Sequence, residues 1–479
     1  MLAILRIMAL FINRDEELAF LESEYAKDSS SLVIIYGRRR VGKTELALKF
    51  RAEKPSVYYL SQKFNLEQQA EDFLEKASEQ LGIYQPKITK WDAALKFVAQ
   101  QIKGKPVIII DEVPYLIEGS NAAMSSFQAA WDLHLKDANV MVILLGSSIG
   151  MMENEVLGYK SPLYGRRTGQ IKVEPLKFAH VAQFFPQKSA EEVVKIYGCL
   201  GGVPAYLNKF DENLSFIDNV NENILQRATF LYDEAAFLLK EELRTPTNYE
   251  LILEAISKGK NRVSEISNET GIPVQNLPKY LRVLINLGFV TKEWAVALKK
   301  TRDIKTGSIY ALEDNFMKFW YTYVYPARSI LEINRDAAIL RIDTTYDQYL
   351  GHIFEDIAKQ YLTDLNIAGK LPFAFERIGR QWGKIPGRQK GANAYEIDVV
   401  ALNEGSKEIM FVECKWQTLT ADNTRRIFDD LLERSKHVRW NDERRQEYFA
   451  VVAKKIENKS ELRDDGMIVF DLDDISSVR

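Results

Sequence analysis

The residues best suited to chemistry lie near the start of the chain, in a glycine-rich stretch that ends in lysine and threonine. Its spacing is G-x-x-x-x-G-K-T, over Gly37, Arg38, Arg39, Arg40, Val41, Gly42, Lys43 and Thr44. Glycines let backbone N–H groups curl around phosphates, the lysine reaches the β- and γ-phosphates, and the threonine hydroxyl ligates Mg2+. These eight residues therefore predict a site for ATP and Mg2+.

Two acidic residues follow a short apolar run farther along the chain. Residues 108–110 are all isoleucine, and Asp111 and Glu112 come directly after them. Asp111 would hold Mg2+ through water, and Glu112 would polarise the water that attacks the γ-phosphate. The next apolar run is followed by Ser147 and Ser148, one of which would sense the γ-phosphate. An ordinary turn at the end of a strand is the alternative for these serines.

An arginine pair, Arg166 and Arg167, follows this region. Supplied by a neighbouring subunit, Arg166 would stabilise charge in the transition state of ATP hydrolysis. This interpretation predicts a homo-oligomer that forms with ATP. The alternatives are a solvated surface pair and an arginine bound to a carboxylate of its own domain.

Three acids and a lysine form a second group near the C-terminus. Glu413 and Lys415 are two residues apart, so on a strand both side chains face the same way. Asp398 and Glu413 can meet if their strands pair as a hairpin, and Glu355 lies on a helix that precedes them. Carboxylate oxygens bind Mg2+ or Mn2+, and a nearby lysine can position water or steady the charge on a scissile phosphate. Glu355, Asp398 and Glu413 are therefore predicted metal ligands, and all four residues are predicted to be catalytic. A surface E-x-K triplet without function is the alternative.

The first group of residues needs the edge of a sheet to hold it. Four short apolar runs, separated by helical patterns, fit the central strands of a parallel sheet covered on both faces: residues 31–36, 57–60, 107–110 and 140–145. A helix over residues 45–50 would point its positive end at the phosphates. The first third of the chain is therefore predicted to be a P-loop ATPase domain.

The middle of the chain changes to short helices, which we expect over residues 249–258, 263–269 and 274–287. A strand pair that runs from residue 288 to about 312 completes the layout of a winged helix-turn-helix. Cations on and before the third helix would contact DNA: Lys258, Lys260, Arg262, Lys279 and Arg282. Packing against a partner is the alternative for this module. The aromatic residues of the run 316–325 fall mostly at helical spacing and predict core packing.

The third region begins near Tyr346, with a predicted helix over residues 349–362 and strands over 395–400 and 409–413. Basic residues interleaved with Trp382 precede Asp398 and predict a loop that contacts the phosphate backbone of nucleic acid: Arg377, Arg380, Lys384, Arg388 and Lys390. A solvated loop is the alternative.

The composition limits the class of protein. A chain of 479 residues is too long for one core, so two to four domains are expected. The net charge of −3 excludes a uniformly basic coat for nucleic acid. Cys199 and Cys414 lie far apart, so no disulfide framework or zinc cluster is predicted, and a reducing cytoplasm fits best.

The apolar start, residues 1–12, resembles the core of a signal peptide but lacks a basic n-region and a small-residue cleavage site. We expect a strand or helix start packed on the ATPase domain; translation beginning at Met8 is another interpretation. No membrane segment is predicted elsewhere, so no membrane partner is expected.

Several motifs together resemble the archaeal-type ATPase family: residues 13–18, 36–44, 110–112, 161–166 and 201–207. The resemblance covers roughly residues 10–240 and implies an AAA+-related STAND NTPase with a helical lid that contains residues 201–204. Such proteins are often regulatory or defence-associated switches.

The end of the chain, about residues 335–479, resembles the DUF234-type domain and the PD-(D/E)xK phosphodiesterase fold. The resemblance places Asp398 as the first acid of the motif, Glu413 as the second, Lys415 as the lysine and Glu355 as the helix acid. The proline of the motif is absent, because Ile397 precedes Asp398.

The predicted fold class is α/β multidomain. Residues 1–240 form the P-loop ATPase domain with a parallel sheet and lid, residues 241–330 the winged helix, and residues 331–479 the nuclease-like domain. The predicted function is a cytoplasmic protein that binds and hydrolyses ATP and acts on DNA or other nucleic acid, with binding or cleavage by the C-terminal domain controlled by the ATPase. The alternatives are a STAND-type switch with an inactive nuclease fold and a transcription regulator that acts through the winged helix.

Overall fold

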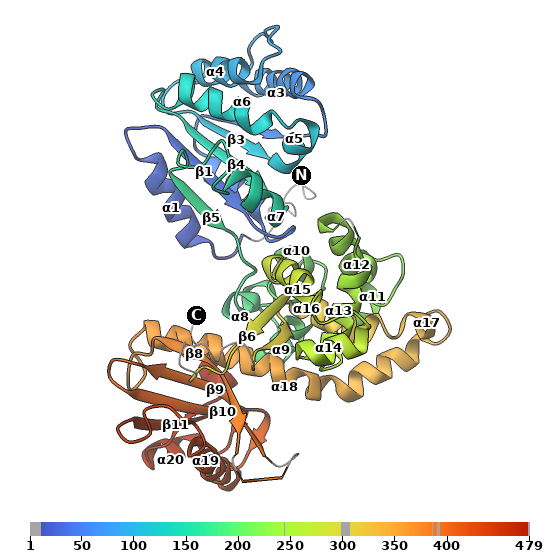
Figure 1. Cartoon of the computed structure of the whole chain (residues 1–479), viewed down its shortest axis with the longest axis vertical. Coiled ribbons are helices and arrows are strands. Elements are labelled where there is room, and N and C mark those ends of the chain that lie inside the picture. The colour runs from blue at the N-terminus through green and yellow to red at the C-terminus, as the bar shows by residue number, and fades with distance from the viewer. Residues whose placement is uncertain (1–10, 244, 298–306, 386, 390–392, 478–479) are drawn as a thin grey trace. The chain divides into compact units, whose positions relative to one another are not determined.

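The computed structural model describes residues 11–243, 245–297, 307–385, 387–389 and 393–477 (Figure 1). The predicted packing of residues 1–12 therefore lies almost wholly outside the described residues, and Lys390 lies outside them too. The chain divides into two compact units. Unit 1 comprises Met1–Leu176 and Val203–Ala205, and unit 2 comprises Lys177–Gly202 and Tyr206–Arg479.

Unit 1 contains a sheet of five parallel strands in the order β2-β3-β4-β1-β5. The strands are β1 (Ser31–Tyr36), β2 (Ser56–Leu60), β3 (Val107–Asp111), β4 (Met141–Gly146) and β5 (Gly169–Lys172). The first four confirm the predicted strands to within a residue at each end. The sequence analysis missed β5 because only Ile171 of its residues is apolar and buried.

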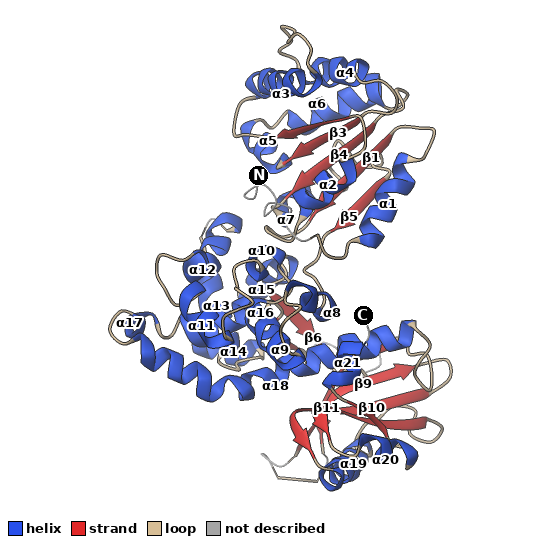
Figure 2. Cartoon of the chain, turned by 180° about the vertical axis from the view of Figure 1, so that it is seen from behind, coloured by secondary structure: helices blue, strands red, loops and turns tan. Residues whose placement is uncertain are grey.

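Helices cover both faces of this sheet (Figure 2). Alternate residues of β1 explain the two layers, since successive side chains of a strand point to opposite faces. Val33 and Ile35 pack with α1 (Asp15–Tyr25) and α2 (Lys43–Arg51). Leu32 and Ile34 belong to the core on the other face, which includes α3 (Leu66–Leu81), α4 (Trp91–Gln101), α5 (Val113–Gly119) and α6 (Ala123–Ala130). Short helical turns complete the unit: η1 (Trp131–Leu135), α7 (Ile149–Met151) and η2 (Met152–Val156).

The helices predicted as a lid follow β5: α8 (Phe178–Val181), η3 (Ala182–Phe184), α9 (Ala190–Leu200), α10 (Pro204–Leu207), α11 (Phe216–Asn223) and α12 (Phe230–Glu242). A capping box of Ser189 and Glu192 starts α9. This helix packs inside unit 2, where a Cβ added to Gly198 would lie 2.7 Å from Leu350 Cδ2. The compact units thus divide the chain before α8. The predicted bounds 1–240, 241–330 and 331–479 stay a prediction.

The winged helix-turn-helix is present in unit 2. Its helices are α13 (Thr247–Ser257), α14 (Val263–Thr270) and α15 (Leu277–Asn286), and its antiparallel strands are β6 (Val290–Glu293) and β7 (Ile309–Leu312). The third helix starts later than predicted, because a turn closed by Asn276 N and Pro273 O precedes it. The aromatic run forms α16 (Asn315–Phe319) and η5 (Trp320–Val324), whose rings are buried, so the prediction of core packing is confirmed.

The C-terminal part contains a mixed sheet in the order β12-β11-β10-β9-β8. Its strands are β8 (Arg377–Lys384), β9 (Ala394–Asn403), β10 (Glu408–Leu419), β11 (Gln446–Ile456) and β12 (Ile468–Phe470). The pairs β8–β9 and β9–β10 are antiparallel, whereas β10–β11 and β11–β12 are parallel. The antiparallel pairing of β9 with β10 confirms the predicted hairpin.

Helices lie on both sides of this sheet, with α18 on one side and α19 and α20 on the other (Figures 1 and 2). Their bounds, with those of the flanking helices, are α17 (Arg328–Leu331), α18 (Arg335–Ile367), α19 (Ala421–Ser435), α20 (Lys459–Asp464) and α21 (Leu472–Ser477). At 33 residues α18 is much longer than the helix predicted over 349–362. Within the described part of the chain, none of the helices has both the length and the hydrophobicity that a membrane span requires.

Candidate nucleotide site and C-terminal carboxylate cluster

The glycine-rich loop joins β1 to α2 and adopts a conformation that depends on its glycines. Gly37 has φ 149° and Gly42, the N-cap of α2, has φ 97°, values that other residues rarely adopt. A Cβ on Gly37 would also lie 2.4 Å from Val173 O. The loop therefore cannot accept a side chain at Gly37 without moving, and it aims the start of α2 at the space where phosphates would bind.

Lys43 lies folded into the loop. Its ammonium donates hydrogen bonds to Gly37 O at 2.9 Å and to Arg38 O at 2.7 Å. The side chain is buried, so it is already positioned at the loop backbone. This is the placement that the prediction of a phosphate-binding lysine requires.

Asp111, at the end of β3, gathers donors from three elements. Its Oδ2 accepts hydrogen bonds from Thr44 Oγ1 at 2.7 Å and from Tyr58 OH at 2.8 Å, and its Oδ1 accepts one from Glu112 N at 2.8 Å. A hydroxyl and a carboxylate in contact are a donor set that fits Mg2+. Tyr58 was not among the predicted site residues, although its place near the end of the neighbouring strand β2 was a usable signal.

Glu112 has a strained backbone. Its φ of 51° is left-handed, a conformation that costs a residue other than glycine on the order of 1 kcal/mol or more. Its Oε1 accepts a hydrogen bond from Ser147 Oγ at 2.5 Å. Ser147, one of the two predicted sensor serines, thus contacts Glu112. The acid, the serine and the loop lie at the same edge of the sheet because parallel strands end together there.

Arg14 supports the loop from the start of the described chain. Its guanidinium donates to Val41 O at 3.1 Å and to Glu174 O at 2.7 Å, and it pairs with Glu17 at 2.9 Å. The side chain is buried, so it ties the glycine-rich loop to the segment after β5. The sequence analysis quoted this residue within a motif but gave it no role.

Arg166 binds a carboxylate of its own domain, which is one of the alternatives that the sequence left open. Its Nε and Nη2 donate to the two carboxylate oxygens of Asp132 at 2.8 and 2.7 Å, and its Nη1 donates to Pro162 O. Arg167 donates to Leu157 O at 2.9 Å. Both arginines are therefore engaged within unit 1, and Arg166 is bound to a carboxylate of its own domain.

The second predicted group lies in unit 2, on β9, β10 and α18. Val412 pairs with Val399, so Glu413 and Asp398 are the next neighbours across the ladder. Cys414 N donates to Asp398 Oδ2 at 2.8 Å, and Lys415 Nζ donates to Glu413 Oε1 at 2.6 Å. Asp398 lies inside β9, and Glu413 lies inside β10 and not at the end of the strand predicted over 409–413, because β10 continues to Leu419.

Asp398 carries the main electrostatic perturbation of this group. Burial, together with the negative charges of Glu413 and Glu355, raises the pKa of Asp398 to about 7. The hydrogen bond from Cys414 N and the charge of Lys415 act in the opposite direction. The structure thus brings Glu355 and Glu413 close enough to act on Asp398, and the metal-binding and catalytic roles of the three acids stay a prediction.

The three carboxylates do not form a ready metal site as they lie. Arg434, on α19, pairs with Glu413 Oε2 at 2.8 Å, so both oxygens of Glu413 face cations. Glu355 Oε1 contacts His352 Nδ1 at 3.0 Å, and its Oε2 lies 3.5 Å from Arg380 Nε. In the described ranges no group of three acidic, histidine or cysteine side chains is arranged to hold a metal ion. The arrangement does not fit the predicted Mg2+ or Mn2+ unless Glu413 exchanges a partner.

The predicted basic loop is for the most part strand β8, and its first two arginines are paired. Arg377 lies 3.1 Å from Glu404, and Arg380 lies 2.7 Å from Glu396. The prediction of a loop was wrong for Arg377 and Arg380, because pairing with β9 makes this segment a strand; their contact with a phosphate backbone stays a prediction. Lys384 and Arg388 are exposed.

Family models match three segments of the chain. Residues 11–210 match the "ATPase domain predominantly from Archaea", residues 251–292 match the "Bacterial regulatory protein, arsR family" helix-turn-helix, and residues 320–427 match DUF234, "Archaea bacterial proteins of unknown function". The predicted archaeal-type ATPase domain, winged helix and DUF234-type domain, and the α/β multidomain class, are confirmed. The resemblance to PD-(D/E)xK enzymes stays a prediction.

Relatives extend these matches to the whole chain. The uncharacterized protein MJECL04 of Methanocaldococcus jannaschii is 39% identical over 98% of this chain and 100% of its own length. The uncharacterized ATP-binding protein MJ0423 of the same organism is 51% identical over 10% of this chain and 80% of its own. A solved structure, the Walker-type ATPase PABY2304 of Pyrococcus abyssi, is 20% identical with a TM-score of 0.50, over 67% of this chain and 96% of that one. At this identity the last likeness shows the fold alone.

Proposed function

The chain belongs to the archaeal-type ATPase family, and from this we propose that it binds and hydrolyses ATP and that unit 2 acts on DNA. The observation that carries the first part is the convergence of Thr44, Asp111, Glu112 and Ser147 at the glycine-rich loop. Lys43 and the loop amides would hold the phosphates, and Thr44 and Asp111 would hold Mg2+. That ion would neutralise charge that develops on the phosphate oxygens.

Glu112 is the residue proposed to orient the attacking water. Its left-handed backbone directs the side chain toward Ser147, which fixes Oε1 at 2.5 Å and leaves the other oxygen without a hydrogen-bond partner among the described residues. A carboxylate held in this way is preorganised to accept a hydrogen bond from water. ATP hydrolysis by the purified full chain, lost in Lys43→Ala, is the expected result. Equal rates for the two proteins would exclude this site.

The winged helix supports the proposal of DNA as the partner. Lys279 and Arg282 are one turn apart on α15, and both side chains are exposed. Lys260 and Arg262 are exposed just before α14, whereas Lys258 is paired with Glu254 and Glu269. Four exposed cations on one module supply the contacts to phosphates that non-specific binding needs.

Fluorescence anisotropy with a labelled duplex tests DNA binding. The double variant Lys279→Ala/Arg282→Ala should bind more weakly and reduce the slope of log K against log salt by about 2, since each phosphate contact contributes about 0.9. Lys436→Ala, an exposed cation of α19's C-terminal end, is the matched control. An unchanged slope in the double variant would exclude α15 as the DNA-binding helix.

A second candidate function is cleavage of the bound DNA by the carboxylate cluster, as the resemblance to PD-(D/E)xK enzymes implies. The observation that favours it is the buried Asp398 beside Glu413 and Lys415. The pairing of Arg434 with Glu413 favours the other alternative, an ATP-dependent switch with an inactive nuclease fold. Supercoiled DNA incubated with Mg2+ or Mn2+, with and without ATP, distinguishes them. Nicking that Lys415→Ala abolishes supports cleavage, and intact DNA with active ATPase supports the switch.

A further inference from the structure

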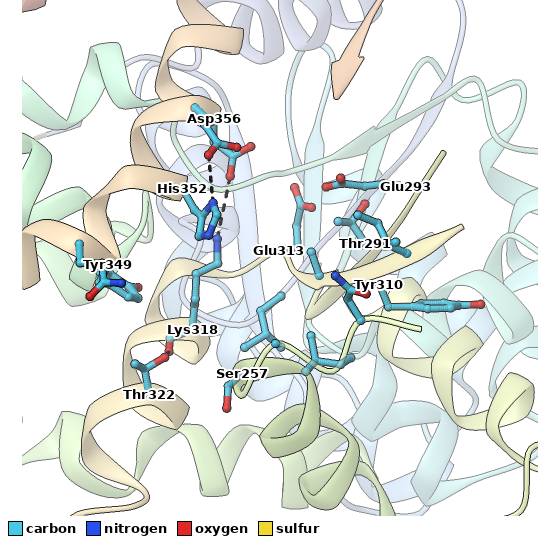
Figure 3. A pocket seen from close by; sticks show the side chains of 18 of the residues that line it. Ser257, Thr291, Glu293, Tyr310, Glu313, Lys318, Thr322, Tyr349, His352 and Asp356 are labelled. Carbon is cyan, nitrogen blue, oxygen red and sulfur yellow. Dashed lines mark hydrogen bonds and ion pairs between the residues drawn. The ribbon is translucent and has the colours of Figure 1, made fainter. Parts of the chain in front are cut away.

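Unit 2 contains a cavity of about 500 Å3 between the winged helix and α18 (Figure 3). The end of α13, the strands β6 and β7, α16, η5, α18 and β8 all contribute to its lining. Cavities of this size accept small organic molecules. None of the residues assigned to ATP lines this cavity, so it is a different site from the nucleotide site.

Charged residues on the α18 side of the cavity satisfy one another. Asp356 lies 3.0 Å from Lys359 and 3.9 Å from Lys318. Glu355 pairs with His352 at 3.0 Å, and this hydrogen bond raises the pKa of His352. Figure 3 shows Lys318, His352 and Asp356 together on this side, opposite Glu293 and Thr291 of the wing. Each of the two acids on this side therefore has a basic partner, and Arg341, which also lines the cavity, donates to Thr322 O.

The wing side carries two carboxylates that accept no hydrogen bond from a described residue. Glu293 is the last residue of β6; its buried Oε2 has no hydrogen-bond partner among the described residues and lies 4.0 Å from Arg380 Nη1. Glu313 directly follows β7, and its side chain makes no hydrogen bond or ion pair with a described residue. Burial raises the pKa of Glu293. Its buried Oε2 without a hydrogen bond is costly, whereas Glu313 is exposed, and both carboxylates are acceptors available to a ligand.

We propose that this cavity binds a small organic cation, an aliphatic amine or guanidine, whose N–H groups donate to Glu293 and Glu313. A charged donor can hydrogen-bond to both carboxylates at once, whereas an anion or a neutral apolar ligand would leave Glu293 Oε2 without a donor. A metal ion is the less suitable cation, because no metal-binding group of three side chains occurs among the residues that the structure describes. The methylene groups of an alkyl amine would pack on Ile256 and Ala311, which also line the cavity.

The cavity adjoins the carboxylate cluster, so a bound ligand would lie near Glu355. Glu355 and Arg380 line the cavity, and Glu355 is one of the charges that act on Asp398. The site proposed here does not depend on cleavage of DNA or on hydrolysis of ATP. Binding of the cation can therefore be measured whether or not the proposed function holds.

Isothermal titration of the full chain with putrescine, agmatine and spermidine, without nucleotide, tests the site. At least one probe should bind with a Kd below 1 mM. Glu293→Gln and Glu313→Gln keep the shape of each side chain and remove its charge, and each should weaken binding at least tenfold. Glu433→Gln, an exposed glutamate of α19, is the matched control and should bind as the unmodified chain does.

Ala311→Leu gives a second check, because it fills the cavity without changing a charge and should also weaken binding. Melting curves establish that each variant is folded. Undetectable binding of all three amines at 1 mM would overturn the proposal. Binding that is equal in Glu293→Gln, Glu313→Gln and Ala311→Leu would overturn it too, since the amine would then bind elsewhere.

Discussion

Replacement of Asp398 by asparagine should stabilise unit 2 at alkaline pH. Asp398 is buried beside Glu413 and Glu355, which together with burial raise its pKa from 3.8 to about 7. The folded protein therefore favours the protonated form of Asp398. Asparagine has nearly the same shape and no charge at any pH, so the variant removes only the cost of ionising this site.

The sign and size follow from linkage. Well below pH 3.8 Asp398 is protonated in both the folded and unfolded chain and contributes nothing to the pH dependence. As the pH rises toward 7 the unfolded chain loses the proton first, so the stability of the unmodified protein falls relative to that of the variant. Above pH 7 the full difference applies: about three pKa units at about 1.4 kcal/mol each, or about 4 kcal/mol.

Thermal melting of the full chain between pH 4 and pH 9 measures the effect. The Tm of Asp398→Asn minus that of the unmodified protein should rise by several degrees between pH 4 and pH 7 and stay level above it. Asp422→Asn, at an exposed position of the same sheet domain, gives the baseline for this type of change. A Tm difference for Asp398→Asn that is the same at pH 5 and pH 8 would refute the reasoning.

Three further changes test unit 1. Glu112→Gln should bind ATP within a few-fold of normal and hydrolyse it about 10²- to 10⁴-fold more slowly in a steady-state assay; a normal rate would remove Glu112 from the reaction. Arg14→Ala should cost about 2–3 kcal/mol in urea unfolding, because Val41 O and Glu174 O lose a charged donor. Arg166→Ala should cost about 1 kcal/mol and keep kcat; a lost kcat that is restored by mixing with a Lys43→Ala protein would instead indicate action in trans.

The sequence predicted those parts of the fold that local patterns determine. Four strands of unit 1 are near-continuous apolar runs, which the sequence shows directly. In the middle of the chain, three helices are followed by a strand pair, and this order was enough to predict a winged helix. β8 was missed because its residues are mostly polar and partly exposed, and it becomes a strand through pairing with β9. The extra length of α18 begins at a clear N-cap, Asn334, which was present in the sequence and not used.

The candidate sites divide in the same way. Lys43, Thr44, Asp111 and Glu112 could be predicted because the turn and the strand ends that hold them are encoded locally. Arg434 could not, since only the packing of α19 on the sheet brings it to Glu413. The cavity with Glu293 and Glu313 could not be predicted either, because its lining comes from seven elements spread over residues 256–380 that only the tertiary fold brings together.

Helix α9 belongs to the segment that matches the ATPase family model, but it packs inside unit 2 and not inside unit 1. The ATPase segment matched across the family ends at residue 210, yet Leu176 already closes the main part of unit 1. Gly198 and Tyr197 of that inherited segment contact Leu350 and Gln360 of α18. A gene fusion that joined this ATPase to a different C-terminal region would therefore expose an apolar helix face.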